Sequence, residues 1–333
     1  MFHRLLITTD FTDGLHRLVN FIPALAQMGL EQVVFLHCVP LQADRNIPQV
    51  DVQRQAAAKA KLERALENCP SNLSVHIELP TGLSSVGARA NAILAAVKKY
   101  QSELIVVGTS IHSLLNEKLF GSTTRELAQK TSVPLLILRP QLVSAYTDEE
   151  LSLRCQHLLR YLLIPYDGSP SGQSVVNYIE AQAKNRPPQS LEACMLCWVL
   201  EKAGRKEVSL LPTAEDCTQL LQAQQQRLEA LDLQVNIDVR QGNAIAEIQQ
   251  VALDFDISAI VVSSKHFGRL WELSIPSFAG EWCVAVGIPS YSFHRSTSPT
   301  ILQRLLIPSF EALLLGIFQL RHNIRLNFFQ FCF

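Results

Sequence analysis

The sequence predicts an α/β protein of two tandem open five-stranded parallel sheets, each with helices on both faces. Short, continuously apolar runs alternate with longer amphipathic segments, which is typical of parallel strands that are covered on both faces and joined by helical crossovers. The same series of segments occurs twice: Leu5 to Asp10 matches Leu162 to Asp167, and Glu103 to Val107 matches Ser258 to Val262. With 333 residues, the chain has room for two domains of ordinary size.

The first unit contains five apolar runs that we expect to be strands: Leu5–Thr9, Val33–Val39, Leu73–Leu79, Ile105–Val107 and Leu135–Leu138. The segments between them are expected to be helices: Asp13–Met28, a polar and alanine-rich stretch around 50–68, Val86–Tyr100 and Ser122–Lys130. Ligands of such sheets bind beyond the carboxyl ends of the strands. The sequence therefore directs the search for a site to the residues that follow each strand.

The second unit repeats this pattern, with strands expected at 161–165, Glu192–Val199, Leu233–Val239, 258–262 and 288–292. These limits divide the chain into repeat 1 (residues 1–140), an exposed linker (141–157), repeat 2 (158–294) and a hydrophobic C-terminal tail (295–333). The apolar runs of the tail are interrupted by Glu311, Arg321 and Arg325, so each is too short to span a bilayer. An extra packed segment, a truncated third repeat, and a tail that docks on a membrane surface or a partner remain open.

Composition excludes several classes of function. The net charge is −1 and charged residues make up 18%, so no nucleic-acid surface is expected. The eight cysteines are scattered, several of them within apolar runs, which is typical of buried thiols in a reducing cytoplasm. We expect no secretory signal at the N-terminus and no membrane span.

The segment from Ile105 to Thr123 is the best candidate for a ligand site. A buried strand ends at Gly108, and after a loop Gly121, Ser122 and Thr123 begin a helix. Small and hydroxyl residues at a helix N-terminus leave backbone N–H groups free to bind phosphate or another anion. In the second unit, Ser263 and Pro276 stand at the positions that correspond to Gly108 and Gly121.

Both repeats resemble the universal stress protein family in its tandem-domain form, whose fold is Rossmann-like. The resemblance is carried by Asp10 after the first strand, by Phe35-Leu36-His37-Cys38-Val39 closing the second, by Gly108 and Gly121-Ser122, and by the final strand after Val133-Pro134. It implies a regulatory protein of the stress response that binds ATP or AMP. Asp10 and Cys38 or Val39 would lie near the base, while Gly108, Gly121, Ser122 and Thr123 would hold ribose and phosphates.

One departure weakens this expectation. The nucleotide-binding branch of the family has a middle glycine in the loop, and this chain has Ile111 there. Isoleucine disfavours a positive φ and projects bulk towards the phosphates. Proline at position 276 lacks the N–H that an anion would use. The motif is therefore degenerate, and nucleotide binding is expected in repeat 1 only.

Each candidate residue also has a purely structural explanation. Asp10, Ser122 and Thr123 can cap a turn or a helix, and Gly82 and Gly242 can serve tight turns. Cys194 and Cys197 form a CxxC pair within a strand, so their side chains point to opposite faces and no metal or redox site is expected. No catalytic constellation can be assembled.

Three functions remain open at this point. The first is a nucleotide-sensing regulator, and the second is a scaffold that binds no nucleotide, which Ile111 favours. The third is a weak ATP-hydrolysing or adenylating enzyme, with Glu117 and Asp10 as its candidate carboxylates. The duplication predicts an intramolecular pseudo-dimer in which Leu135–Leu138 pairs with Ser290–Phe293. It leaves open a homodimer and an unidentified protein partner.

Overall fold

The computed structural model describes residues 2–42, 49–82, 85–108, 122–138, 147–188, 190–201, 212–263 and 283–288. Repeat 1 has the five predicted strands and the helices between them, and in addition two short strands and a division of the first helix. Its elements are β1 (Arg4–Thr8), the 3-10 helix η1 (Leu15–Phe21), α1 (Ile22–Gln27), β2 (Gln32–Leu36), the short strands β3 (Leu41–Gln42) and β4 (Gln49–Val50), α2 (Val52–Glu67), β5 (Ser74–Glu78), α3 (Val86–Tyr100), β6 (Leu104–Gly108), α4 (Ser122–Lys130) and β7 (Leu135–Leu138).

A helix in the segment predicted as the linker precedes repeat 2. The elements are α6 (Asp148–Gln156), β8 (Tyr161–Pro165), α7 (Pro170–Ala183), β9 (Ala193–Leu200), α8 (Ala214–Glu229), β10 (Gln234–Gln241), α9 (Ala244–Asp254), β11 (Ala259–Ser263) and β12 (Cys283–Ile288). Several helices begin at a side-chain cap. Asp51, Ser85, Ser169 and Thr213 each accept a hydrogen bond from a backbone N–H of the first turn of their helix.

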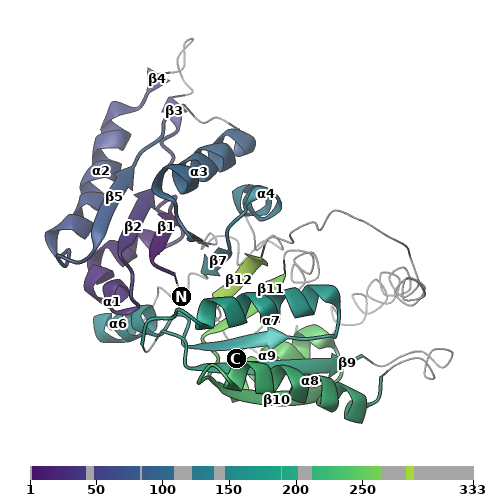
Figure 1. Cartoon of the computed structure of the whole chain (residues 1–333). Coiled ribbons are helices and arrows are strands. Elements are labelled where there is room, and N and C mark those ends of the chain that lie inside the picture. The colour runs from purple at the N-terminus through teal and green to yellow at the C-terminus, as the bar shows by residue number, and fades with distance from the viewer. Residues whose placement is uncertain are drawn as a thin grey trace, which may run out of the picture. The chain divides into compact units, whose positions relative to one another are not determined.

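The two repeats form one ten-stranded sheet in the order β10-β9-β8-β11-β12-β7-β6-β1-β2-β5. Within each half all pairs are parallel, and β7 and β12 join the halves as an antiparallel pair in which Leu136 lies opposite Ala285. Figure 1 shows β7 and β12 side by side between the strands of the two repeats. The predicted fold class is confirmed. The two inner strands pair within one chain as expected, but β7 pairs with Val284–Val286 and not with Ser290–Phe293.

The position predicted for the last strand was wrong. It was expected at 288–292, by analogy with β7 after Pro134, whereas β12 spans Cys283–Ile288. The run Cys-Val-Ala-Val-Gly-Ile is continuously apolar and rich in β-branched residues, which favours a buried strand. Pro289 follows directly and lacks the N–H that a ladder requires.

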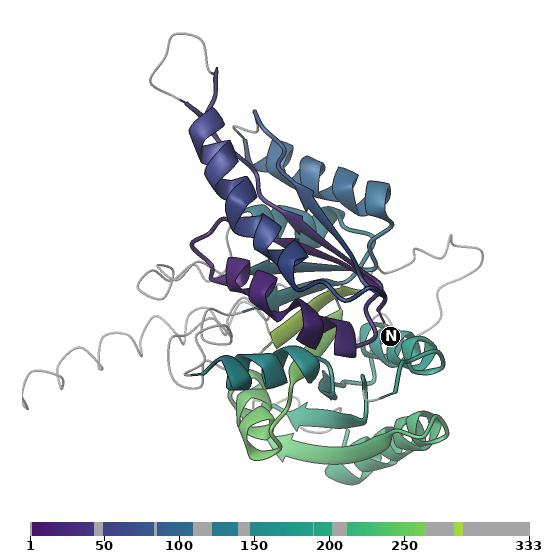
Figure 2. The same ribbon diagram turned by 90° about the vertical axis from the view of Figure 1, so that its left-hand side faces the viewer.

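Two hydrophobic clusters, one on each face of the sheet, run through both repeats. One contains buried residues of η1, α1, α2, α6, α7 and α8, including Leu62 and Val176. The other contains buried residues of α3, α4 and α9, including Ile93 and Val251. Figure 2 shows the helices on both sides of the strands. Cys194 lies in the first cluster and Cys197 in the second, which confirms that the CxxC pair points to opposite faces.

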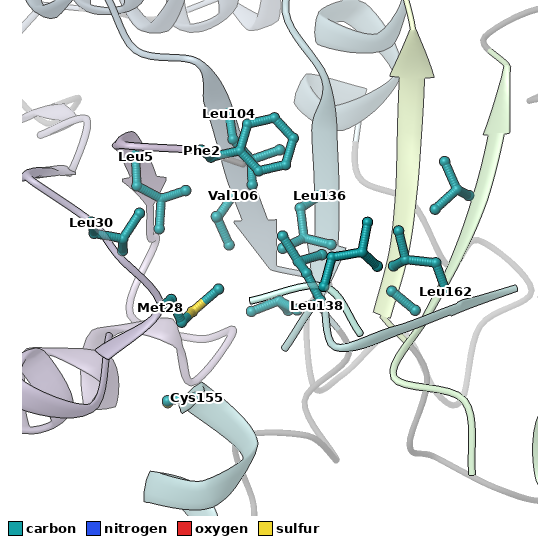
Figure 3. Close-up of a cluster of buried hydrophobic side chains, with 14 of the residues drawn as sticks. Phe2, Leu5, Met28, Leu30, Leu104, Val106, Leu136, Leu138, Cys155 and Leu162 are labelled. Carbon is teal, nitrogen blue, oxygen red and sulfur yellow. The ribbon is translucent and has the colours of Figure 1, made fainter. Parts of the chain in front are cut away.

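The segment predicted as an exposed linker is partly a packed helix. Thr147 caps α6, and Leu151 and Cys155 are buried in the first cluster. Figure 3 shows Cys155 near Met28, while Phe2, Val106 and Leu138 belong to the same cluster. The acidic run at 148–150 occupies the first turn of α6, where negative charge is favourable. Among the described residues, no helix has the length and hydropathy needed to span a membrane, and the tail lies outside them.

Packing of α6 can be tested on two leucines of the same helix. Leu151→Ala should reduce the free energy of unfolding by about 2–5 kcal/mol, because Leu151 is buried at 1% exposure. Leu153→Ala is the matched control, because Leu153 is 54% exposed, and we expect a change within about 0.5 kcal/mol. Urea denaturation of both variants measures the difference, and equal losses would contradict the packing.

Candidate functional site

The candidate site lies at the carboxyl edge of the first half of the sheet. In β1, Thr8 pairs with Leu36 of β2 and with Val107 of β6, so all three strands end at one level. The segments after them, Thr9 to Gly14 and His37 to Val39, and the end of β6 at Gly108 therefore meet at this edge. Residues 109–121 follow β6 and are not described, so Gly121, Ile111 and Glu117 lie outside the described residues.

Asp10 is exposed and has one carboxylate oxygen engaged. Its Oδ1 atom accepts hydrogen bonds from the Thr12 backbone N–H at 2.8 Å and from the Thr12 hydroxyl at 2.7 Å. This is the turn-forming role that the sequence allowed. The Oδ2 atom has no hydrogen bond to any described residue, so it is free to accept one from a ligand.

Asp13 is the buried carboxyl group of this edge, and the sequence analysis did not select it. Its side chain accepts hydrogen bonds from the Thr9 hydroxyl at 2.8 Å, from the Leu15 N–H at 3.0 Å and from the Asp10 N–H at 3.4 Å. Asp13 is 4% exposed and forms no ion pair with a described cation. Burial, together with the nearby charge of Asp10, raises its pKa to about 6. The sequence placed Asp13 only at the start of the helix expected over Asp13–Met28.

Gly108 makes room for Asp13. A Cβ atom at position 108 would lie 2.4 Å from the Asp13 Cβ and 2.8 Å from its Oδ2. In repeat 2, Pro170 stands at the position of Asp13 and Ser263 at the position of Gly108. Where the aspartate is missing, the end of the strand therefore carries a side chain. Packing against Asp13 is therefore sufficient to explain this glycine without a ligand.

The turn after Asp10 has a left-handed residue that is not glycine. Phe11 has φ 65°, and the corresponding Gly168 of repeat 2 has φ 69°. The Phe11 ring lies 4.3 Å from the His37 ring and 5.6 Å from the His16 ring, measured between centroids, and the Lys61 Nζ lies 5.0 Å from the Phe11 centroid. These contacts hold an aromatic residue in a conformation that such residues rarely adopt.

Both histidines near the turn favour the neutral form. Burial lowers the pKa of His37, and burial with the nearby Lys61 and Arg17 lowers the pKa of His16. The His37 Nδ1 atom lies 2.9 Å from the Thr9 carbonyl oxygen, which can only accept, so we assign the proton to Nδ1. His37 therefore joins the end of β2 to the turn after β1.

Cys38 and Val39 continue this edge. Val39 is buried, and its N–H donates to the Pro80 carbonyl at 2.9 Å. Burial raises the pKa of the half-buried Cys38 to about 11, so its thiol stays protonated and unreactive. Gly82 has φ 80° and no atom within 4 Å of a Cβ placed on it, so backbone conformation explains this glycine. Ser122, exposed, and Thr123, half-buried, begin α4 as predicted.

The same edge of repeat 2 is arranged differently. Asp167 is exposed, and its Oδ1 accepts a hydrogen bond from the Ser169 N–H at 3.0 Å. Trp198 stands at the position of His37 and is only 7% exposed. Its ring packs against Gly168, where an added Cβ would lie 2.9 Å from the indole. An indole side chain thus covers the turn of repeat 2. In neither repeat do the described residues include a group of three metal-ligating side chains.

The model of the universal stress protein family matches residues 1–139 and 159–280. The chain belongs to the universal stress protein family. Two matched segments in one chain make it a tandem member, as the resemblance implied. Among curated proteins, none has significant sequence similarity to it.

Solved structures of universal stress proteins share this fold. One from Archaeoglobus fulgidus is 15% identical, with a TM-score of 0.59 over 85% of this chain and 97% of its own. A putative one from Pseudomonas aeruginosa is 14% identical, with a TM-score of 0.52 over 86% of this chain and 93% of its own. A shorter universal stress protein was solved in complex with cAMP; it is 15% identical, with a TM-score of 0.28 over 42% of this chain and 98% of its own.

The contact between Gly108 and Asp13 can be tested with two glycine substitutions. Gly108→Ala should reduce the free energy of unfolding by about 1–3 kcal/mol, because the new methyl group overlaps the Asp13 side chain. Gly87→Ala in α3 is the control, because nothing lies within 4 Å of a Cβ at that position. That variant should keep its stability or gain up to about 1 kcal/mol. Thermal or urea unfolding of the two variants gives the comparison.

Burial of Asp13 predicts a pH-dependent stability difference. Between the ordinary pKa of 3.8 and the raised value of about 6, the folded protein holds a proton that the unfolded chain releases. Stability from this group is therefore present at low pH and falls as pH rises towards 6. Relative to Asp13→Asn, which does not titrate, wild type should lose about 2 kcal/mol between pH 4.5 and 7.5. Urea denaturation at both pH values measures this, and a constant difference would contradict the buried carboxyl.

Proposed function

We propose that this chain is a regulatory module of the stress response that binds ATP or AMP at repeat 1 and is not a dedicated catalyst. The observation that carries the proposal is the exposed Asp10 carboxylate at the carboxyl edge of β1, β2 and β6. One of its oxygens fixes the turn through Thr12, and the other is available for the amino group of a base. Half-buried Cys38 supplies apolar surface at the end of the neighbouring strand, and Val39, which is buried, would pack beneath it.

The charges around this edge suit an anionic ligand. The charge of Lys61 in α2 helps to lower the pKa of His37, and the charge of Arg89 in the first turns of α3 has a lowering influence on the pKa of Cys38. Both cations therefore lie near the ends of β1 and β2. Neither cation forms an ion pair with a described residue. Ser122 and Thr123 stand at the N-terminus of α4, where N–H groups favour phosphate. Gly121 would join them, and Gly108 would allow close approach of the backbone.

Repeat 2 serves in this proposal as the structural partner of repeat 1. Trp198 covers its turn, and Ser263 stands where repeat 1 has Gly108. The two repeats act as an intramolecular pseudo-dimer through the pairing of β7 with β12. The cytoplasmic location, a homodimer, a protein partner and the role of the tail stay predictions.

A scaffold that binds no nucleotide is the second candidate. The contact of Gly108 with Asp13 and the bonds of Asp10 to Thr12 favour it, because they explain two motif residues without any ligand. An ATP-hydrolysing or adenylating enzyme is the third. Of its two candidate carboxylates, Asp10 already accepts two hydrogen bonds, and Glu117 lies outside the described residues.

The test compares the two equivalent aspartates. Asp10→Asn should weaken ATP and AMP binding by about 10- to 150-fold, because loss of a hydrogen bond to a charged acceptor costs about 1.5–3 kcal/mol. The amide keeps an oxygen for the Thr12 turn, so the fold is retained. Asp167→Asn in repeat 2 is the matched control and should leave the affinity unchanged. Isothermal titration calorimetry of the intact chain measures both. If wild type binds neither ATP nor AMP, the proposed function is wrong and the scaffold that binds no nucleotide remains.

A further inference from the structure

Asp13 is a buried acid that the proposed function does not use. It is 4% exposed, its three hydrogen-bond donors are neutral, and no described cation pairs with it. A buried carboxylate without a cationic partner is costly, and such groups occur mostly where they serve a function. Repeat 2 has Pro170 at this position, so the fold does not need an acid there.

The position of Asp13 relates it to the nucleotide site. Its carboxyl group lies between the Asp10 backbone and Gly108, on the side of Gly108 towards which a side chain would point. Asp10 is the proposed base contact, and Gly108 is the first residue of the proposed phosphate loop. A phosphate bound close to the backbone of Gly108 would therefore lie near the Asp13 carboxylate, and the two negative charges would repel each other.

We propose that Asp13 makes nucleotide binding at repeat 1 depend on proton uptake: its ionised carboxylate opposes the phosphates, and its protonated form admits them. The inference rests on the proposed function and adds to it a preference for acidic conditions. The raised pKa of Asp13 supports it, because the proton can be gained near neutral pH. A bound phosphate would favour the protonated form further, since like charges disfavour ionisation.

Other ionisable groups surround the same turn. They are Asp10 beside Asp13, His16 and Arg17 of η1, His37 at the end of β2, and Lys61 of α2. On β6, the residue beside Asp13 is Gly108, which has no ionisable side chain. All of these groups are present in both wild type and Asp13→Asn, and the ligand's own ionisation is the same in both. The ratio of the two affinities therefore isolates Asp13.

The experiment titrates the full-length wild type and Asp13→Asn with ATP and with adenosine at pH 7.5 and 5.5. At pH 7.5 the variant should bind ATP on the order of tenfold more tightly, because one negative charge near the phosphates is lost. At pH 5.5 the ratio should approach one, because wild type is then protonated. Adenosine, which has no phosphate, should bind both proteins equally at either pH. Asp167→Asn is the control and should behave as wild type.

The outcomes separate the inference from the proposed function. An ATP ratio that is the same at both pH values, or an equal change for adenosine, overturns the inference and leaves nucleotide binding intact. No binding of any adenine compound by wild type overturns the proposed function and the inference with it. If Asp13→Asn does not fold, Asp13→Ser takes its place in the same titrations: an ATP affinity ratio that changes between pH 7.5 and 5.5 supports the role of Asp13, and a constant ratio overturns it.

Discussion

The antiparallel pairing of β7 with β12 is the constraint on which this structure depends. Each repeat alone would end in an edge strand with unpaired N–H and C=O groups, and such edges invite association with other chains. With the two inner edges joined, β5 and β10 are the edge strands of the sheet that the described residues form. It also aligns the faces of the two halves, so that each hydrophobic cluster continues from one repeat to the other. Duplication of one unit has thereby produced a single sheet with two shared cores.

The two halves differ most at their carboxyl edges. Repeat 1 keeps a buried acid, Asp13, and a left-handed Phe11, both of which cost stability. Repeat 2 has Pro170 and Gly168 at these positions, which removes both costs. Since the same sheet forms in both halves, the costly arrangement is not required by the fold. This asymmetry is the physical argument for assigning function to repeat 1.

Prediction from sequence succeeded where periodicity is strong and failed where local signals competed. The bounds of α3, α4 and β7 were predicted to the residue, because their apolar patterns end at clear polar boundaries. A single helix predicted over Asp13–Met28 is instead a 3-10 turn followed by α1, because Pro23 cannot donate to the preceding turn. The last strand was misplaced because its pairing with β7 is set by tertiary structure, and the linker was misjudged because the burial of Leu151 arises only in tertiary contact.

The sequence by itself determined the α/β class, the duplication and the family, because these follow from local periodicity and from residues that adjoin strand ends. The edge of the sheet where a ligand would bind stays a prediction. Tertiary structure alone decided that Asp13 is the buried acid, that Gly108 is small because Asp13 fills its side-chain space, and that Trp198 covers the second edge. Those facts depend on which residues meet across β1, β2 and β6 in repeat 1 and across β8 and β9 in repeat 2. Residues distant in sequence approach one another only once the strands are paired, and no local pattern records that contact.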